Sequence, residues 1–205
     1  MIPAHLIFIM KEFLSGFLII LSAFTFTACG GGDETTSTST NTSINADQKL
    51  YENSELAIAY PQDWEILERD DFTSNVPAST VVAIRSNIKN EKFTPNISVN
   101  KKDFTQDTKS IDFAKGTIEQ AKNTLQNFKE IESKAVKVKF GKNELDGYLA
   151  TFQGKNDAAS PVVGFSQLYV VNGKTGYMIT AAYLFDADQA TLKMIDSSLN
   201  SFMLK

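Results

Sequence analysis

The sequence predicts an α+β domain, in which a mostly antiparallel sheet is flanked by two main helices. Two segments, near residues 110–128 and 186–202, place apolar side chains at spacings of three and four, as in helices that cover a sheet. Short runs rich in β-branched residues surround them, and Asn172-Gly173 is a strong hairpin signal. The content of 42% hydrophobic and 21% charged residues is typical of a folded domain.

The first strands are expected between residues 56 and 101. Segment 56–60 is apolar and ends at Pro61, and Trp64 begins a further apolar signal that runs through Ile66 and Leu67. Segment 79–85 is rich in β-branched residues, and segment 96–101 alternates apolar and polar side chains. These patterns indicate strands, and in segment 96–101 the apolar Ile97 and Val99 share one face.

The spacing of apolar residues after Ser110 predicts the first helix. Its stripe consists of Ile111, Ala114, Ile118, Ala121, Leu125 and Phe128. Ser110 is a candidate N-cap, and Asp112 in the first turn suits the positive end of the helix dipole. The opposite side, with Lys115 and Glu119, is expected to face water.

Two hairpins and a final helix are expected in the rest of the chain. Segment 141–147 (GKNELDG) is expected to turn a strand that ends at Phe140 back into a strand at 148–153. Segments 161–171 and 175–184 form the second hairpin around Asn172-Gly173-Lys174, because Asn and Gly both tolerate positive φ. Segment 186–189 (DADQ) looks like a capping box with Asp in place of Ser. The apolar face of the helix that follows is Leu192, Ile195, Leu199 and Phe202.

Cys29 is the one cysteine of the chain, and it follows an apolar run. Segment 13–24 (FLSGFLIILSAF) is shorter than the ~20 residues of a membrane-spanning helix but suits a signal peptide. Segment 26–29 (FTAC) resembles the lipobox of bacterial lipoprotein precursors, although that family prefers Leu where Phe26 stands. The resemblance implies that Cys29 receives a diacylglyceryl group and becomes the mature first residue, often with a further acyl chain such as palmitate. The alternative is an ordinary cleaved or uncleaved anchor.

These features divide the chain into three parts. Residues 1–28 are expected to be a lipoprotein signal peptide, with Met10 as an alternative start because the charge of Lys11 directly follows it. Residues 29–47 are expected to be a lipidated, flexible tether, because Gly, Thr and Ser dominate there. Residues 48–205 form the predicted globular domain. In a Gram-negative host, Gly30 after the cysteine favours the periplasmic face of the outer membrane over the inner membrane.

Several short motifs occur in order between Tyr51 and Leu204. They are YPxxW at 60–64, LQNF at 125–128, LDGY at 145–148, GKTGYMIT at 173–180 and LNSF at 199–202. With the order of strands and helices, they resemble the PsbP-like superfamily, which includes the DcrB-type bacterial lipoproteins and the Ran-binding Mog-type proteins. The resemblance implies an antiparallel sheet flanked by helices and a binding or accessory role. Metal sites proposed in photosynthetic members use histidine, so the resemblance implies no metal ligand here.

The residue types exclude several kinds of chemistry. The one histidine, His5, lies in the segment expected to be removed, so Ser-His-Asp, Cys-His and His/Cys zinc sites are not expected. The phosphate-binding patterns GxxxxGK[ST] and GxGxxG do not occur. The net charge of −4 argues against nucleic acid as a partner. We therefore expect no enzyme, no cofactor and no metal.

Two local features leave alternatives open. The acidic residues Glu65, Glu68, Asp70 and Asp71 suggest a solvated loop, and the alternative is a Ca²⁺ site, although the spacing matches no known loop. Trp64 is expected to be a core residue at a strand end, and the alternative is a platform for a ligand.

Three functions are compatible with these observations. The first is a monomeric binding or accessory module, held at the membrane by the lipid on Cys29, whose partner is an envelope protein or a small ligand. The alternative is a structural or stress-related envelope component without a dedicated ligand. A third, carboxylate-based hydrolysis, would need two paired carboxylates, and nothing in the sequence pairs them.

Overall fold

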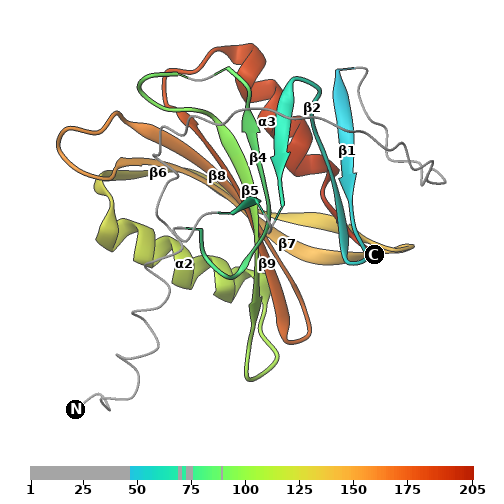
Figure 1. The fold of residues 1–205 in the computed structure, drawn as a ribbon. Helices are drawn as coiled ribbons and strands as arrows, with labels where there is room; N and C mark the ends of the chain where they lie inside the picture. The colour runs from blue at the N-terminus through green and yellow to red at the C-terminus, as the bar shows by residue number, and fades with distance from the viewer. Residues whose placement is uncertain (1–46, 69–70, 73–75, 89) are drawn as a thin grey trace, which may run out of the picture.

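A computed structural model describes residues 47–68, 71–72, 76–88 and 90–205, so Cys29 and the predicted signal peptide lie outside the described residues. In the described part, ten strands form one sheet in the order β1-β2-β10-β6-β7-β8-β9-β5-β4-β3, and two helices pack against it (Figure 1). The strands are β1 (Gln48–Glu52), β2 (Leu56–Pro61), β3 (Trp64–Leu67), β4 (Thr80–Ser86), β5 (Asn96–Asp103), β6 (Gln126–Phe140), β7 (Asn143–Lys155), β8 (Val163–Asn172), β9 (Thr175–Leu184) and β10 (Met203–Leu204). The helices are α2 (Ser110–Thr124) and α3 (Gln189–Ser201). Neighbouring strands are antiparallel except β10 and β6, so the largely antiparallel α+β fold is confirmed.

The two helices cover opposite faces of the curled sheet. Side chains of β8 alternate between the faces: Phe165 and Tyr169 belong to the apolar clusters beneath α2, whereas Leu168 and Val170 belong to the main core beneath α3. The α2 helix lies over β6–β8, and α3 lies over β2 and β9. The core is therefore divided by the sheet into two layers.

The buried side of α2 differs from the predicted stripe. Ile111 is 38% exposed, and the first turn instead buries Ser110 and Phe113. The helix ends at Thr124, so Phe128 belongs to β6. The predicted N-cap at Ser110 is wrong as well, because Lys109 precedes the helix without a side-chain cap.

Ser110 has a different structural role. Its Oγ donates to the backbone oxygen of Asp146 at 2.5 Å and accepts from the N–H of Val171 at 3.0 Å. The start of α2 is thus fastened to β7 and β8 by one buried hydroxyl.

Both predicted hairpins form, but their turns are tighter than expected. Gly141-Lys142 joins β6 to β7, so the predicted turn 141–147 is mostly strand. Gly173-Lys174 joins β8 to β9, and Asn172 is still paired with Thr175. The glycines have φ of 54° and 60°, and only the first position of each loop needs a positive φ, which is the pattern of type II′ turns.

The last helix begins later than the predicted capping box. Asp188, not Asp186, is the N-cap, and its carboxylate accepts from the N–H of Thr191 at 2.7 Å. The predicted apolar face is correct, because Ile195, Leu199 and Phe202 are all buried.

The strand β6 has a long edge that faces away from β7. Of the described strands, β10 pairs with this edge only at Lys139 and Phe140. Two irregularities, one near Asn127 with φ 55° and one between Glu130 and Glu132, interrupt the strand. Bulges and charged side chains are devices that protect an open edge from pairing with another chain.

The sheet has two ends that matter for the sites below. At the Trp64 end, the chain enters β1 beside Gln62, and the loops 62–63, 87–95, 156–162 and 185–188 connect the strands. At the Glu55 end, the β1–β2 turn, the two tight hairpins and the C-terminus come together. The register of the antiparallel pairs from β3 to β9 assigns each loop to its end.

Candidate functional site

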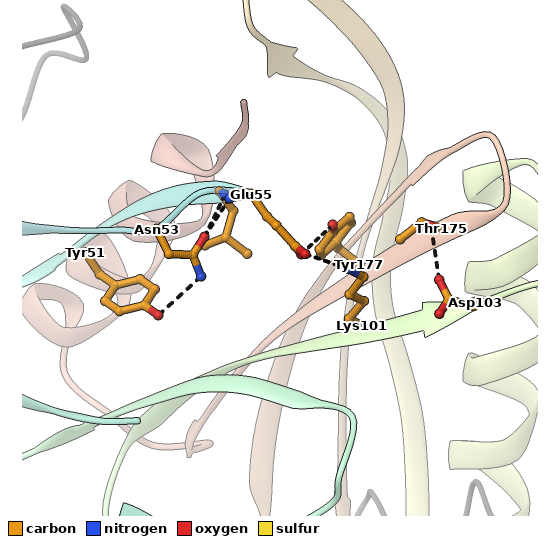
Figure 2. Close-up of polar contacts among 8 residues, drawn as sticks. Tyr51, Asn53, Glu55, Lys101, Asp103, Thr175 and Tyr177 are labelled. Carbon is orange, nitrogen blue, oxygen red and sulfur yellow. Dashed lines mark hydrogen bonds and ion pairs between the residues drawn. The ribbon is translucent and has the colours of Figure 1, made fainter. Parts of the chain in front are cut away.

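A polar cluster at the Glu55 end joins three parts of the chain that are far apart in sequence (Figure 2). Glu55 lies in the β1–β2 turn, Lys101 on β5 and Tyr177 on β9. Lys101 Nζ donates to Glu55 Oε1 at 2.7 Å, and Tyr177 OH donates to Glu55 Oε2 at 2.9 Å. We call these three residues the Glu55 clasp.

The β1–β2 turn presents Glu55 because Asn53 shapes it. The side-chain oxygen of Asn53 accepts from the N–H of Glu55 at 2.9 Å and of Leu56 at 3.0 Å, which is how Asn stabilises a turn. The backbone oxygen of Glu55 accepts from the N–H of Lys205 at 3.0 Å. The turn therefore also holds the C-terminus.

On the other side of the clasp, neighbouring strand residues position the cation and the phenol. Lys101 and Tyr177 are direct partners in the β5–β9 register, and the ammonium lies 5.9 Å from the centre of the tyrosine ring. Two positions along, Thr175 Oγ1 donates to Asp103 at 3.0 Å (Figure 2). The cluster thus stands on two rigid strands and one short turn.

The electrostatics of the clasp favour its charged form. The hydrogen bond from Lys101 lowers the pKa of Glu55 below its usual 4.5; burial opposes this shift, and the bond from Tyr177 adds to it. The bond to Glu55 raises the pKa of Lys101, and burial together with Glu55 raises that of Tyr177. All three shifts move the groups away from neutral pH, whereas a general acid or base works best with a pKa near it. The arrangement is suited to holding the turn on the sheet and not to proton transfer.

Replacing Glu55 by glutamine is expected to cost up to about 1 kcal/mol of unfolding free energy at pH 7, because the ion pair is partly exposed. A carboxylate whose pKa is lowered by folding stabilises the protein above its unfolded pKa, and this contribution is lost as the pH falls through the folded value. Urea unfolding should therefore separate wild type from Glu55→Gln more widely at pH 7 than at pH 3. Glu91→Gln, at an exposed glutamate of the opposite end, is the control. Equal stability at pH 7, or a difference at pH 3 as large as that at pH 7, would contradict this role.

Trp64, the predicted core residue and alternative ligand platform, is 5% exposed and belongs to the main core cluster. It begins β3 and is the direct partner of Ser86 on β4. Its indole ring is thus part of the layer beneath α3.

The acidic run after Trp64 does not converge within the described residues. The Glu65 carboxylate pairs with Arg85 across the β3–β4 ladder, and Asp71 accepts from the N–H of Glu68 at 3.0 Å. Asp70 lies outside the described residues. No group of three or more His, Cys, Asp or Glu side chains that could hold a metal occurs in the described part.

Buried polar atoms of the described residues are also satisfied by the protein itself. On the α2 face, Tyr169 OH donates to Gln167, and Gln167 donates to Thr180 at 3.0 Å. Burial raises the pKa of Tyr169 strongly, so its hydroxyl stays protonated as a donor. Every buried side-chain nitrogen or oxygen in this part has a partner, which leaves no orphaned group to point to an absent ligand.

Sequence reasoning missed the Glu55 clasp. Lys101 is 46 positions from Glu55, and Tyr177 is 122 positions from it. The alternation of segment 96–101 could have shown that Lys101 shares a face with Ile97 and Val99, but no local signal could pair it with a turn glutamate.

Comparison with known proteins identifies the family of this chain. A family model described as PsbP-like protein matches residues 18–204. The chain belongs to the PsbP-like family. This match confirms the resemblance carried by the sequence motifs, and it extends well upstream of Tyr51. Among curated proteins, no sequence match was found.

Two solved structures share the PsbP-like fold. CyanoP, the cyanobacterial PsbP of Synechocystis sp. PCC 6803, matches 82% of this chain and 98% of its own with a TM-score of 0.57 and 14% identity. LpqN of Mycobacterium tuberculosis matches 73% of this chain and 83% of its own with a TM-score of 0.55 and 16% identity. At these identities the likeness concerns the fold. No helix among the described residues is long and apolar enough to span a membrane.

Proposed function

We propose that this protein is a lipid-anchored accessory protein of the bacterial cell envelope that acts by binding and not by catalysis. The observation that carries the proposal is the PsbP-like family match over residues 18–204, which includes all of the described domain except Lys205. A second support is that LpqN, which shares the fold, is described as involved in cell envelope biogenesis.

The chemistry of the described residues supports a role without catalysis. The most elaborate polar cluster, the Glu55 clasp, uses both carboxylate oxygens for internal partners. The glutamate of the acidic run that lies on a strand, Glu65, is neutralised by Arg85. Neither carboxylate is poised to take a proton from a substrate.

Cys29 provides the proposed link to the membrane. The apolar run at 13–24, the FTAC sequence and the Gly-, Thr- and Ser-rich segment that follows support lipidation of this cysteine. Two or more acyl chains give stable anchoring, whereas one chain gives only marginal binding. Gly30 supports the periplasmic face of the outer membrane as the destination in a Gram-negative host.

Replacing Cys29 by serine is expected to remove the protein from the membrane fraction or to leave an uncleaved precursor. Intact-mass measurement of the wild-type protein should show a chain that begins at Cys29 and carries diacylglyceryl and acyl groups. Membrane separation should place the wild-type protein mainly in the outer membrane. An unmodified thiol in a soluble product would overturn the anchor, and recovery in the inner membrane would overturn the destination alone.

A further inference from the structure

Two large apolar side chains are exposed at the Trp64 end of the sheet. In the described part of the chain, four large hydrophobic residues are exposed: Ile88 (72%), Ile131 (49%), Phe185 (48%) and Ile111 (38%). Ile88 lies in the β4–β5 loop, and Phe185 directly follows β9. We call Ile88 and Phe185 the apolar pair.

The strand order places the apolar pair at the same end of the sheet. Arg85, Asn96 and Ala182 form one row across β4, β5 and β9. Ile88 and Phe185 each come three residues after a member of that row, just beyond the ends of β4 and β9, which run in the same direction. One strand, β5, lies between those two strand ends, which sets the ends about 10 Å apart. The N–H of Phe185 donates to the oxygen of Val162 at 3.1 Å, which continues the β8–β9 pairing as far as Phe185.

The loops around the apolar pair are acidic. By sequence, the four loops of the Trp64 end contain five acidic residues and two lysines. The acidic residues are Asp63, Glu91, Asp157, Asp186 and Asp188, and all five are exposed. The loops of the Glu55 end are 53–55, 68–79, 104–109, 141–142 and 173–174, and with Lys205 they contain, by sequence, five acidic and five basic residues. The acidic excess is thus specific to the end that exposes the pair.

This combination selects one class of partner. An apolar centre within a charged rim is the usual anatomy of a protein–protein contact. An anionic lipid surface is disfavoured, because the carboxylates would be repelled by it. We infer that the Trp64 end docks a basic segment of a partner protein, which places an apolar side chain between Ile88 and Phe185 and its cationic side chains against the acidic loops. This inference rests on the proposed binding function and names the chemistry of its partner.

Two synthetic peptides test this inference directly. Fluorescent dodecapeptides of alternating Lys and Leu, and of alternating Glu and Leu, are titrated with the full chain purified from membranes in a neutral detergent. Anisotropy should show binding of the Lys/Leu peptide that weakens with salt, and at least ten-fold weaker binding of the Glu/Leu peptide. Equal binding of both peptides would overturn the inference.

Matched variants locate the binding surface. Ile88→Ser and Phe185→Ser should each weaken Lys/Leu peptide binding at least five-fold. Ile131→Ser, at a residue that is as exposed as Phe185 but lies elsewhere, should leave it within two-fold. The double variant Glu91→Gln/Asp186→Asn should weaken binding and reduce its salt dependence. Thermal melts confirm that each variant is folded. An equal loss in Ile131→Ser, or no loss in either apolar variant, would contradict the inference.

A vesicle arm distinguishes a protein partner from a lipid surface. The soluble form recovered from the Cys29→Ser chain is mixed with vesicles of phosphatidylethanolamine and phosphatidylglycerol and sedimented, and no binding is expected. Binding that is lost in Ile88→Ser or Phe185→Ser would assign the pair to the membrane instead. A negative result with the peptides would not affect the proposal that Cys29 carries lipid. A finding that Cys29 is not lipidated would not affect the peptide result, so the two proposals can fail separately.

Discussion

Replacing Trp64 by alanine is expected to lower the free energy of unfolding by about 3–5 kcal/mol, the usual cost of removing a buried large aromatic side chain. The ring is 5% exposed and packs in the main core cluster beneath α3. Because Trp64 begins an edge strand, the cavity left behind also weakens the β3–β4 pairing. Chemical denaturation followed by circular dichroism measures the loss without the fluorescence of the one tryptophan.

The matched control for this change is Ile131→Ala, at a half-exposed residue of β6. It should alter the unfolding free energy by less than about 0.5 kcal/mol. A loss below about 1 kcal/mol for Trp64→Ala would instead indicate a ring at the surface, and the alternative of a ligand platform would then return. Wild-type fluorescence offers a second check, because a buried indole should be poorly quenched by iodide.

Deleting Met203–Lys205 is expected to destabilise the domain by more than about 4 kcal/mol, which approaches the whole stability of a typical domain. Met203 and Leu204 are 7% and 3% exposed. They also form β10, the two-residue strand between β2 and β6. Without it, the β1–β2 hairpin keeps the packing of α3 but loses its ladder to the rest of the sheet. Loss of a cooperative thermal transition would support this role.

Lys205→Ala is the control for the deletion. It keeps the N–H that donates to the Glu55 oxygen and removes an ion pair with Glu52 at 3.5 Å, so the expected change is below about 1 kcal/mol. A deletion variant that melts like wild type would show that α3 alone holds the hairpin.

The sequence predicted the elements whose signals are local and repetitive. Strands β2, β4, β5, β8 and β9 were found within a few residues, and both helices were placed by their apolar periodicity. The Asn-Gly signal correctly marked the β8–β9 hairpin. The resemblance to the PsbP-like family rests on short motifs, and these can likewise be recognised from neighbouring residues in the sequence.

The errors occurred where a distant partner decides the structure. Ser110 looks like an N-cap in the sequence. In the fold its hydroxyl instead forms hydrogen bonds with the backbone of Asp146 and Val171, and these bonds join the helix to the sheet. Strand β10 has no recognisable pattern, because two residues become a strand only when β2 and β6 lie on either side. Strand β1 was not predicted either, since neither of its sides is uniformly apolar: Gln48, Leu50 and Glu52 share one side, and Lys49 and Tyr51 share the other.

The candidate sites were even harder to predict. Local sequence pointed to Trp64 and the acidic run, which are conspicuous in composition. The Glu55 clasp uses ordinary residues that only the fold brings together. The apolar pair likewise depends on the β4–β5–β9 register, because a single exposed isoleucine or phenylalanine is normal on any surface.

Strand β10 also constrains when this protein can fold. The ladder that joins the β1–β2 hairpin to β6 is made by residues far along the chain, as in the pairing of Ala57 with Met203. A chain that emerges N-terminus first must therefore keep the edge of β2 open until β10 has been made. Such long-range closure makes folding slow, and the waiting edge is exposed to aggregation. The step that closes this part of the sheet therefore waits for Met203 and Leu204, long after β1 and β2 have been made.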